Sequence, residues 1–328
     1  MPGHLKYGTV FTTNALEENM HAQSDLPGRT RVCQNHHLDS TRWDMVEPRD
    51  GDIVIATSLK AGTTWTQAIV SNLLYPNKSF PAPVWTLNPW IDFRGIPWEV
   101  IAEGLEQPVP RRTLKTHLPL ESLRFFRQAK YLYVSRDGRD VALSLWNHHA
   151  KYSAQAYAEA NDTPGLVGAK FPYPPKDFHA YWKEWCTRGW FDWESDGYPF
   201  WSHLHNVQSW WPYRHLPNIM FMHYADMKHD TPGAIRKIAD FLGIPADDDA
   251  VQAVAQEVTI ESMRSDADNY VPDGGSSWVG GAQTFLHKGI NGRWKDILSD
   301  QELAFYEQAC DRVLTDDCRR WLEHGGPV

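Results

Sequence analysis

Residues 52–74, DIVIATSLKAGTTWTQAIVSNLL, predict a short buried strand that runs through a tight loop into a helix. The strand, residues 53–57, is a mainly apolar run that follows the turn signal Arg-Asp-Gly-Asp. The helix begins near Thr63, after which apolar residues recur at helical spacing. This order of elements is typical of α/β domains built on a parallel sheet.

The loop between strand and helix suits a phosphate-like anion. The N-terminus of a helix directs free N–H groups and a partial positive charge at such a ligand. Gly62 lets the backbone approach closely, and Lys60 adds a full charge. The loop is not a Walker A motif, because its lysine precedes the glycine, so a nucleoside triphosphatase is disfavoured. The alternative interpretation is an ordinary turn with a solvated lysine.

Further strands are predicted at residues 112–116, 130–135 and 218–223. Helices are expected over residues 137–149 and 231–242, the second ending at the C-cap Gly243. Strands that alternate with helices imply a mainly parallel central sheet with helices on both faces. We therefore predict an α/β fold.

We expect residues 1–328 to form a single domain, because the sequence contains no internal repeat and no low-complexity linker. Residues 1 to about 45 form an N-terminal segment in this interpretation. Residues from about 150 to 200 mix proline and glycine with aromatic residues. We expect them to form an irregular insertion that caps one end of the sheet and shapes a ligand pocket.

Composition excludes several classes of protein. A net charge of -9 argues against a nucleic-acid partner bound through a general basic surface. The four cysteines are scattered and form no C-x-x-C pair, which indicates reduced thiols and no zinc site. The first thirty residues lack a signal-peptide core, and no apolar run approaches 18 residues. We therefore expect a cytoplasmic protein with no membrane partner.

A second candidate anion site lies in residues 131–149, YLYVSRDGRDVALSLWNHH. Arg136 directly follows a predicted strand, and Ser144 lies about two turns into the next helix. An arginine and a serine so placed can bind one phosphate through a charged fork and a hydroxyl. The alternative is a surface arginine that pairs with Asp137 or Asp140.

A third candidate lies in residues 285–296, FLHKGINGRWKD, which concentrate lysine, arginine and glycine. Glycine beside lysine lets backbone and side chain converge on an anion. The alternative is a basic exposed loop.

Together, the three segments resemble the cytosolic sulfotransferase family, whose members use 3′-phosphoadenosine 5′-phosphosulfate (PAPS). The family's 5′-phosphosulfate loop, Pro-Lys-Ser-Gly-Thr-Thr-Trp, is similar to residues 59–65. Its 3′-phosphate strand and helix match Arg136 and Ser144, and its Arg-Lys-Gly-x-x-Gly-x-Trp-Lys loop matches residues 287–295. The resemblance covers roughly residues 50–300. It implies a single α/β domain with a P-loop-like phosphosulfate loop.

The resemblance also implies a set of nucleotide-binding residues and no metal. The donor would be PAPS, and the product 3′-phosphoadenosine 5′-phosphate (PAP). Adenine would pack on the tryptophan of the first loop, whose alternative role is in the core. The implied contacts are Lys60, Ala61, Gly62, Thr63, Thr64, Trp65, Arg136, Ser144, Thr259, His287, Lys288 and Gly289.

Residues 115–119, Lys-Thr-His-Leu-Pro, match the family segment that carries a catalytic histidine. The resemblance implies that His117 takes the proton from an acceptor hydroxyl as its oxygen attacks sulfur, a task that suits a histidine pKa. Lys60 would then stabilise charge on the oxygen that leaves sulfur, and Lys115 would neutralise the sulfuryl oxygens. The alternative is a structural histidine, one of 15 in the chain.

Three departures from the family pattern stand out. Ala61 replaces a serine, and His287 replaces an arginine, which weakens a contact to the 3′-phosphate. The Thr-Val pair of the family's dimer segment is missing after Lys295. The chain can still form an oligomer, but we do not expect the family's dimer interface.

Fifteen aromatic residues between Phe171 and Tyr213 predict an aromatic pocket for a small apolar alcohol or phenol. The alternative is that many of them form core, as we favour for Trp210 and Trp211. The sequence leaves three functions open. They are a sulfotransferase, a lyase that eliminates a transient sulfate ester, and a nucleotide-binding protein without catalysis.

Overall fold

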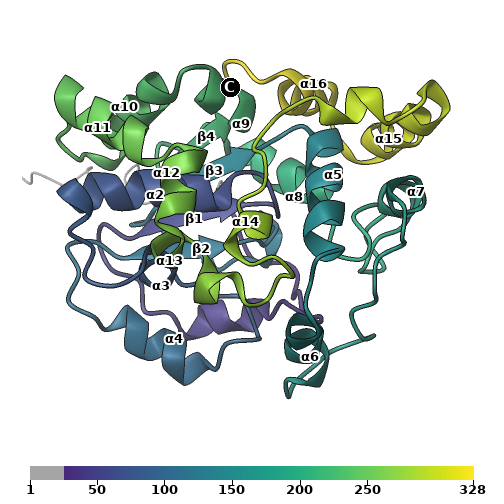
Figure 1. The fold of residues 1–328 in the computed structure, drawn as a ribbon, viewed down its shortest axis with the longest axis horizontal. Coiled ribbons are helices and arrows are strands. Elements are labelled where there is room, and N and C mark those ends of the chain that lie inside the picture. Colours follow the sequence, from purple (N-terminus) through teal and green to yellow (C-terminus); the bar gives the residue numbers. More distant parts are fainter. Residues whose placement is uncertain (1–25) are drawn as a thin grey trace, which may run out of the picture.

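A computed structural model of the protein describes residues 26–328 (Figure 1). Its centre is a four-stranded, all-parallel sheet with the strand order β2-β1-β3-β4. The strands are β1 (Ile53–Thr57), β2 (Thr113–Thr116), β3 (Lys130–Ser135) and β4 (Ile219–His223). Each predicted strand is found to within one residue, and the predicted α/β fold is confirmed. Residues 1–25 of the expected N-terminal segment lie outside the described residues.

Helices surround the sheet on both faces (Figure 1). The α-helices are α2 (Thr63–Leu74), α3 (Val84–Leu87), α4 (Trp98–Leu105), α5 (Gly138–His149), α6 (Ala154–Asp162), α7 (Phe178–Thr187), α8 (His203–Trp210), α9 (Tyr224–His229), α10 (Thr231–Leu242), α11 (Asp248–Glu257), α12 (Ile260–Ser265), α13 (Ala267–Tyr270), α14 (Ala282–Phe285), α15 (Asp300–Val313) and α16 (Asp316–His324). The 3₁₀ helices are η1 (Ser40–Met45), η2 (Pro76–Lys78), η3 (Leu120–Ser122), η4 (Trp211–Tyr213), η5 (Pro272–Gly275) and η6 (Arg293–Asp296).

Strand β1 is buried along its whole length, because it lies between two other strands and under helices on both faces. Alternate residues of a strand point to opposite faces. Ile53 and Ile55 therefore pack with α2, α10 and α11, in one apolar cluster. Val54 and Ala56 pack into a second cluster on the other face, together with α5, α7, α8 and α15.

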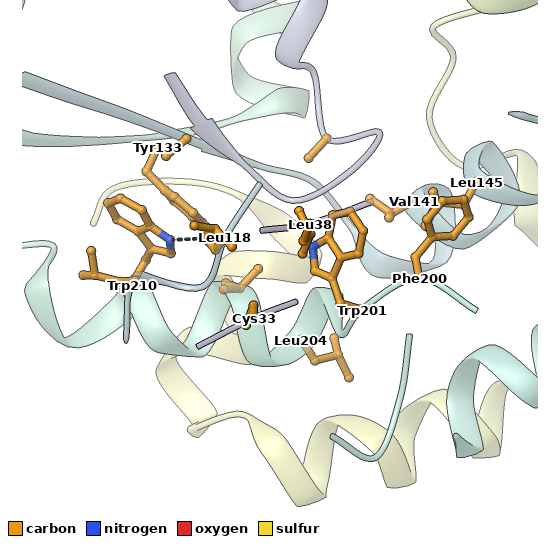
Figure 2. Close-up of a cluster of buried hydrophobic side chains, with 14 of the residues drawn as sticks. Cys33, Leu38, Leu118, Tyr133, Val141, Leu145, Phe200, Trp201, Leu204 and Trp210 are labelled. Atoms are coloured by element: carbon orange, nitrogen blue, oxygen red, sulfur yellow. Dashed lines mark hydrogen bonds between the residues drawn. The ribbon is translucent and has the colours of Figure 1, made fainter. Parts of the chain in front are cut away.

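The second cluster is rich in aromatic side chains (Figure 2). Tyr133 of β3 stacks on Trp210 of α8, with 5.0 Å between ring centroids, and the Trp210 indole donates to the carbonyl of Leu118. Trp210 and Trp211 are both buried, so they belong to the core, as favoured from the sequence.

The stretch from 150 to 200 is more regular than expected, since it contains α6 and α7. Ser153 and Asp177 cap these helices with their side chains, a local signal that the surrounding prolines and glycines masked. Trp182 and Trp185 of α7 are fully buried, and Trp182 stacks on Tyr306 of α15. These two tryptophans therefore form core rather than a pocket wall.

The four cysteines are free and buried, which agrees with reduced thiols. Within residues 26–328, no helix has both the length and the apolar character needed to cross a membrane.

Candidate active site

The order of the strands reverses between β1 and β3, which lie side by side in the sheet. In open parallel sheets, ligands bind beyond the carboxyl ends of the strands at such a switch point. The loop that carries Lys60 leaves the end of β1, and Arg136 follows the end of β3. The first two predicted anion segments therefore meet at one edge of the sheet.

The loop after β1 has a backbone that requires glycine at one position. Gly62, the N-cap of α2, has a φ of +116°, and a Cβ atom there would lie 2.9 Å from the Tyr224 ring. Lys60 also has a positive φ, of +62°. The Thr63 hydroxyl lies 2.6 Å from that of Thr57, while Thr64 is half-buried. Ala61 is fully buried and packs in the same apolar cluster as Val54 and Ala56.

The ammonium group of Lys60 is held between two groups that sequence analysis did not pair with it. It lies 3.3 Å from His148 Nδ1 and 5.1 Å from the centroid of the Phe285 ring. Burial, followed by the nearby charges of Arg136 and Lys115, lowers the pKa of Lys60 to about 8. The cations that the sequence assigned to separate segments thus lie close enough to affect one another.

His117 is buried at the end of β2, with its ring directed at β1. Its Nδ1 atom lies 2.8 Å from the carbonyl oxygen of Thr57 and 3.2 Å from the Thr57 hydroxyl. A carbonyl can only accept, so Nδ1 carries a proton and Nε2 keeps its lone pair in the neutral ring. Burial, then the charges of Lys115 and Lys60, holds the pKa of His117 well below its usual value. His117 is therefore neutral near pH 7.

A buried carboxylate, Asp92, organises the surroundings of His117. It accepts hydrogen bonds from the indole of Trp43 at 3.0 Å, the indole of Trp90 at 2.7 Å and the backbone N–H of His117 at 3.3 Å. The rings of Trp90 and His117 meet edge-on, with 4.8 Å between their centroids. The ammonium group of Lys115 lies 4.6 Å from the centroid of the Trp90 ring. Burial lowers the pKa of Lys115 to about 8, although the nearby negative charge of Asp92 acts to raise it.

Arg136 is buried, so it is not a surface arginine, although it does pair with Asp140, with 3.8 Å between Nη2 and Oδ1. Its guanidinium lies 4.6 Å from the centroid of the Tyr224 ring and donates to Asn291 Oδ1 and to the Ile290 carbonyl, both at 2.9 Å. Asp137 pairs instead with Arg139. Arg136 therefore joins the end of β3 to the third predicted segment, residues 285–296.

The resemblance implies three further residues as nucleotide contacts. Ser144 is half-buried on α5. Trp65 is half-buried and meets Tyr224 edge-on at 5.4 Å. Thr259 is exposed, and its side chain caps α12 by accepting from the Ser262 N–H. Their roles toward a nucleotide stay predictions.

Aromatic residues near His117 and Lys60 come partly from segments that the sequence did not single out. Trp201, whose indole donates to the His117 carbonyl at 2.9 Å, and Phe285 beside Lys60 belong to segments that it did. Phe93 stacks on Trp90 at 4.6 Å, with 13° between the rings. Trp278 lies 4.8 Å from His148 and 4.7 Å from Phe285. The only sequence signal for Trp90 and Phe93 was the density of aromatic residues around position 90, and Trp278 stands alone in its segment. Among residues 26–328, no group of His, Cys, Asp and Glu side chains is arranged to hold a metal ion.

Comparison with known proteins decides the family. The model of the sulfotransferase domain matches residues 50–317. The chain belongs to the sulfotransferase domain family. The sulfotransferase is 30% identical over 317 residues to the glycolipid sulfotransferase of Mycobacterium bovis (strain BCG / Pasteur 1173P2), an alignment that covers 92% of this chain and 97% of the relative. This chain is also 27% identical over 266 residues to sulfotransferase 1A1 of Bos taurus, an alignment that covers 78% of this chain and 81% of the relative.

Solved structures agree on the fold of the sulfotransferase. Mouse sulfotransferase SULT7A1, complexed with PAP, superposes with a TM-score of 0.66 at 19% identity, covering 88% of this chain and 93% of that one. Retinol dehydratase, in complex with androsterone and PAP, superposes with a TM-score of 0.61 at 21% identity, covering 84% of each chain. PAP is thus bound in both related structures.

Proposed function

We propose that this sulfotransferase moves the sulfuryl group of PAPS to the hydroxyl of a small, mainly apolar alcohol or phenol. The observation that carries the proposal is the placement of a histidine with a free Nε2 beside a group of cations that lack acidic partners. Among the described residues, no carboxylate lies within 4.0 Å of Lys60, Lys288 or Arg293. In a chain with a net charge of -9, such a concentration of unpaired cations fits a polyanionic ligand.

The donor nucleotide would lie across the ends of β1 and β3. Its 5′-phosphosulfate would meet Lys60 and the N–H groups of residues 61–65, including those of Gly62, Thr63 and Thr64. Its 3′-phosphate would meet Arg136, Ser144 and the loop of His287, Lys288 and Gly289. Adenine would contact Trp65 and Thr259. These roles follow from the family resemblance and from the clustering of the cations.

Catalysis would depend on position and charge rather than on a covalent intermediate. His117 Nε2 would accept the proton of the acceptor hydroxyl as that oxygen attacks sulfur. Lys60 would stabilise the negative charge that develops on the oxygen leaving sulfur, and Lys115 would neutralise the sulfuryl oxygens. The anionic donor would also offset the positive charges that lower the pKa of His117, which makes the ring a stronger base when the donor is bound.

The acceptor would lie against the aromatic residues near His117. The stacked rings of Trp90 and Phe93 would provide one apolar wall, and Tyr152, Trp278 and Phe285, which cluster around His148, would provide another. Flat apolar walls with few polar groups favour an acceptor with an apolar body and one reactive hydroxyl. The glycolipid sulfotransferase similarity supports testing amphiphilic glycolipids beside phenols and sterols.

The test is to incubate the protein with PAPS and a panel of phenols, sterols, aliphatic alcohols and glycolipids, and to identify products by mass spectrometry. We expect one acceptor class to gain one sulfuryl group with release of PAP. The His117→Ala variant should form product at least about 100-fold more slowly under the same conditions. Loss of one water from the acceptor would indicate the lyase instead, and PAP binding without any turnover would indicate a nucleotide-binding protein.

A further inference from the structure

We propose that Arg293 binds the terminal 3′-phosphate of the donor nucleotide, and that His287 takes up a proton from solvent when that phosphate binds. The inference rests on the proposed function, because it assigns further residues to the same nucleotide site. It concerns the loop of residues 286–293, which lies against the ends of β3 and α12.

The backbone of this loop is fixed by donors from three other elements. Arg264 of α12 donates to the carbonyls of Leu286 and His287, at 2.9 and 2.7 Å. Arg136, after β3, donates to the carbonyl of Ile290 at 2.9 Å. The loop therefore has a defined shape in which much of its main-chain acceptor capacity is already used.

Two further backbone groups of the loop are held by side chains of α9 and α5. The Gly289 carbonyl accepts from Tyr224 at 3.4 Å and from Lys228, both in α9. The Gly292 N–H donates to both carboxylate oxygens of Asp140, at 2.9 and 3.0 Å. Gly289 and Gly292 have positive φ values of 59° and 77°, which turn the chain sharply on either side of residues 290 and 291. These turns bring residue 293 back toward residue 287.

The side chains of His287 and Arg293 meet as a result. Nη1 of Arg293 lies 3.4 Å from Nδ1 of His287. A guanidinium can only donate, so Nδ1 of His287 is an acceptor and the ring is neutral in this pair. The other arginines near the end of β3, Arg136 and Arg139, each lie within 4.0 Å of a carboxylate, at Asp140 and Asp137 respectively, whereas no described carboxylate lies that close to Arg293.

The charges of four cations act on His287, and no carboxylate of residues 26–328 lies within 4.0 Å of any of the four. Arg293 and Lys288 belong to its own loop, Lys60 comes from the loop after β1, and Arg264 comes from α12. Burial and these charges lower the pKa of His287. A phosphate dianion placed among them reverses the local field, so it favours the protonated ring and gives the phosphate one more donor.

The binding test uses isothermal titration with PAP and with AMP, which lacks the 3′-phosphate. In Arg293→Gln, we expect PAP to bind about tenfold more weakly or worse, as for the loss of a charged hydrogen bond, while AMP binds as in the wild type. Lys295→Gln is the matched control, because it removes one exposed cation of the same segment that does not face His287. It should leave both affinities unchanged.

The outcomes separate the two levels of the proposal. A wild-type protein that prefers PAP to AMP, with the same preference in Arg293→Gln, would overturn the role of Arg293 alone. A folded wild-type protein that binds neither nucleotide would overturn the proposed function itself. Equal weakening of PAP and AMP in Arg293→Gln would show a general loss of loop structure and would also overturn the assignment.

The proton test repeats the PAP titration at pH 7 in two buffers of different ionisation enthalpy. We expect net proton uptake by the wild type, and clearly less uptake by His287→Gln, in which residue 287 cannot titrate. The phosphate, with a pKa near 6, and Lys60 and Lys115, each with a pKa lowered to about 8, titrate in both proteins, so the difference between the two proteins reports on residue 287. Equal uptake by the two proteins would overturn the role of His287.

Discussion

The Nδ1 atom of His117 lies 2.8 Å from the carbonyl oxygen of Thr57, so the proton of the neutral ring is held on Nδ1. The Thr57 hydroxyl contacts the Thr63 hydroxyl in the first turn of α2. One residue at the end of β1 therefore sets both the tautomer of the proposed base and the start of the proposed phosphate loop. The two halves of the proposed site are joined at Thr57.

Replacing His117 should separate catalysis from nucleotide binding. His117→Ala removes the proposed proton acceptor, and general-base catalysis typically contributes about 10²–10⁴-fold to the rate. We expect kcat to fall by that amount, while the affinity for PAP stays within a factor of about three of wild type. Steady-state kinetics and titration with PAP measure the two quantities. Loss of PAP binding in a folded variant would contradict the role of His117 as base.

Binding of the donor should weaken at high pH. Lys60 and Lys115 each have a pKa lowered to about 8, so both are charged below that pH and lose their protons above it. An anionic ligand binds the charged forms more tightly, so the affinity for PAP should fall as pH rises from 7 to 9. Titrations at the two pH values test this, with Lys60→Met expected to show weaker binding at pH 7 and a smaller pH dependence. An affinity that does not change over this range would argue against contact with these ammonium groups.

Asp92→Asn should destabilise the protein. The new amide group cannot accept from all the N–H donors that surround Asp92, and an unsatisfied buried donor costs about 1–3 kcal/mol. We expect the free energy of unfolding to fall by about that amount in urea denaturation. Asp248→Asn is the matched control, because its pairing with Arg236 is exposed and such a change is worth about 0.5 kcal/mol or less. Equal stability of the two variants would mean that Asp92 does not organise its neighbours.

Gly62→Ala should damage the loop after β1. A Cβ atom at a φ of +116° is strained, and it would lie 2.9 Å from the Tyr224 ring. We expect a lower Tm and weaker PAP binding. Gly104→Ala serves as a control, because a Cβ atom there meets nothing within 4 Å and alanine favours the helix. If Gly62→Ala retains the wild-type Tm and PAP affinity, the loop does not depend on this backbone conformation.

The sequence predicted the sheet well, because each strand is a short apolar run bounded by turn signals and each motif lies directly beside a strand. Positions such as Lys60 and Arg136 could be brought together by reasoning about parallel strands alone. His148, Asp92 and Trp90 could not, because their contacts depend on how segments distant in the sequence pack. The helices α6 and α7 were missed for a related reason. Their caps are local, but proline and glycine nearby suggested irregular structure.

The roles of the aromatic residues also depend on packing that the sequence does not reveal. Their density between residues 171 and 213 predicted a pocket, yet Trp182, Trp185 and Trp210 are fully buried in the core. Composition indicates that apolar surface will be covered, but it does not say whether protein or ligand will cover it. From that stretch, Trp201 donates to the His117 carbonyl, while the rings of Trp90 and Trp278, outside the stretch, lie beside the rings of His117 and His148.

The most direct test of the account is thermal unfolding of the wild-type protein with PAP, ATP or NADH. A ligand at 100 times its Kd adds about 2.7 kcal/mol to the free energy of unfolding, which raises Tm by several degrees. We expect such a rise with PAP and a much smaller one with ATP or NADH. No rise with PAP in a folded sample, or equal rises with all three, would contradict a nucleotide site built from Lys60, Arg136 and the 286–293 loop.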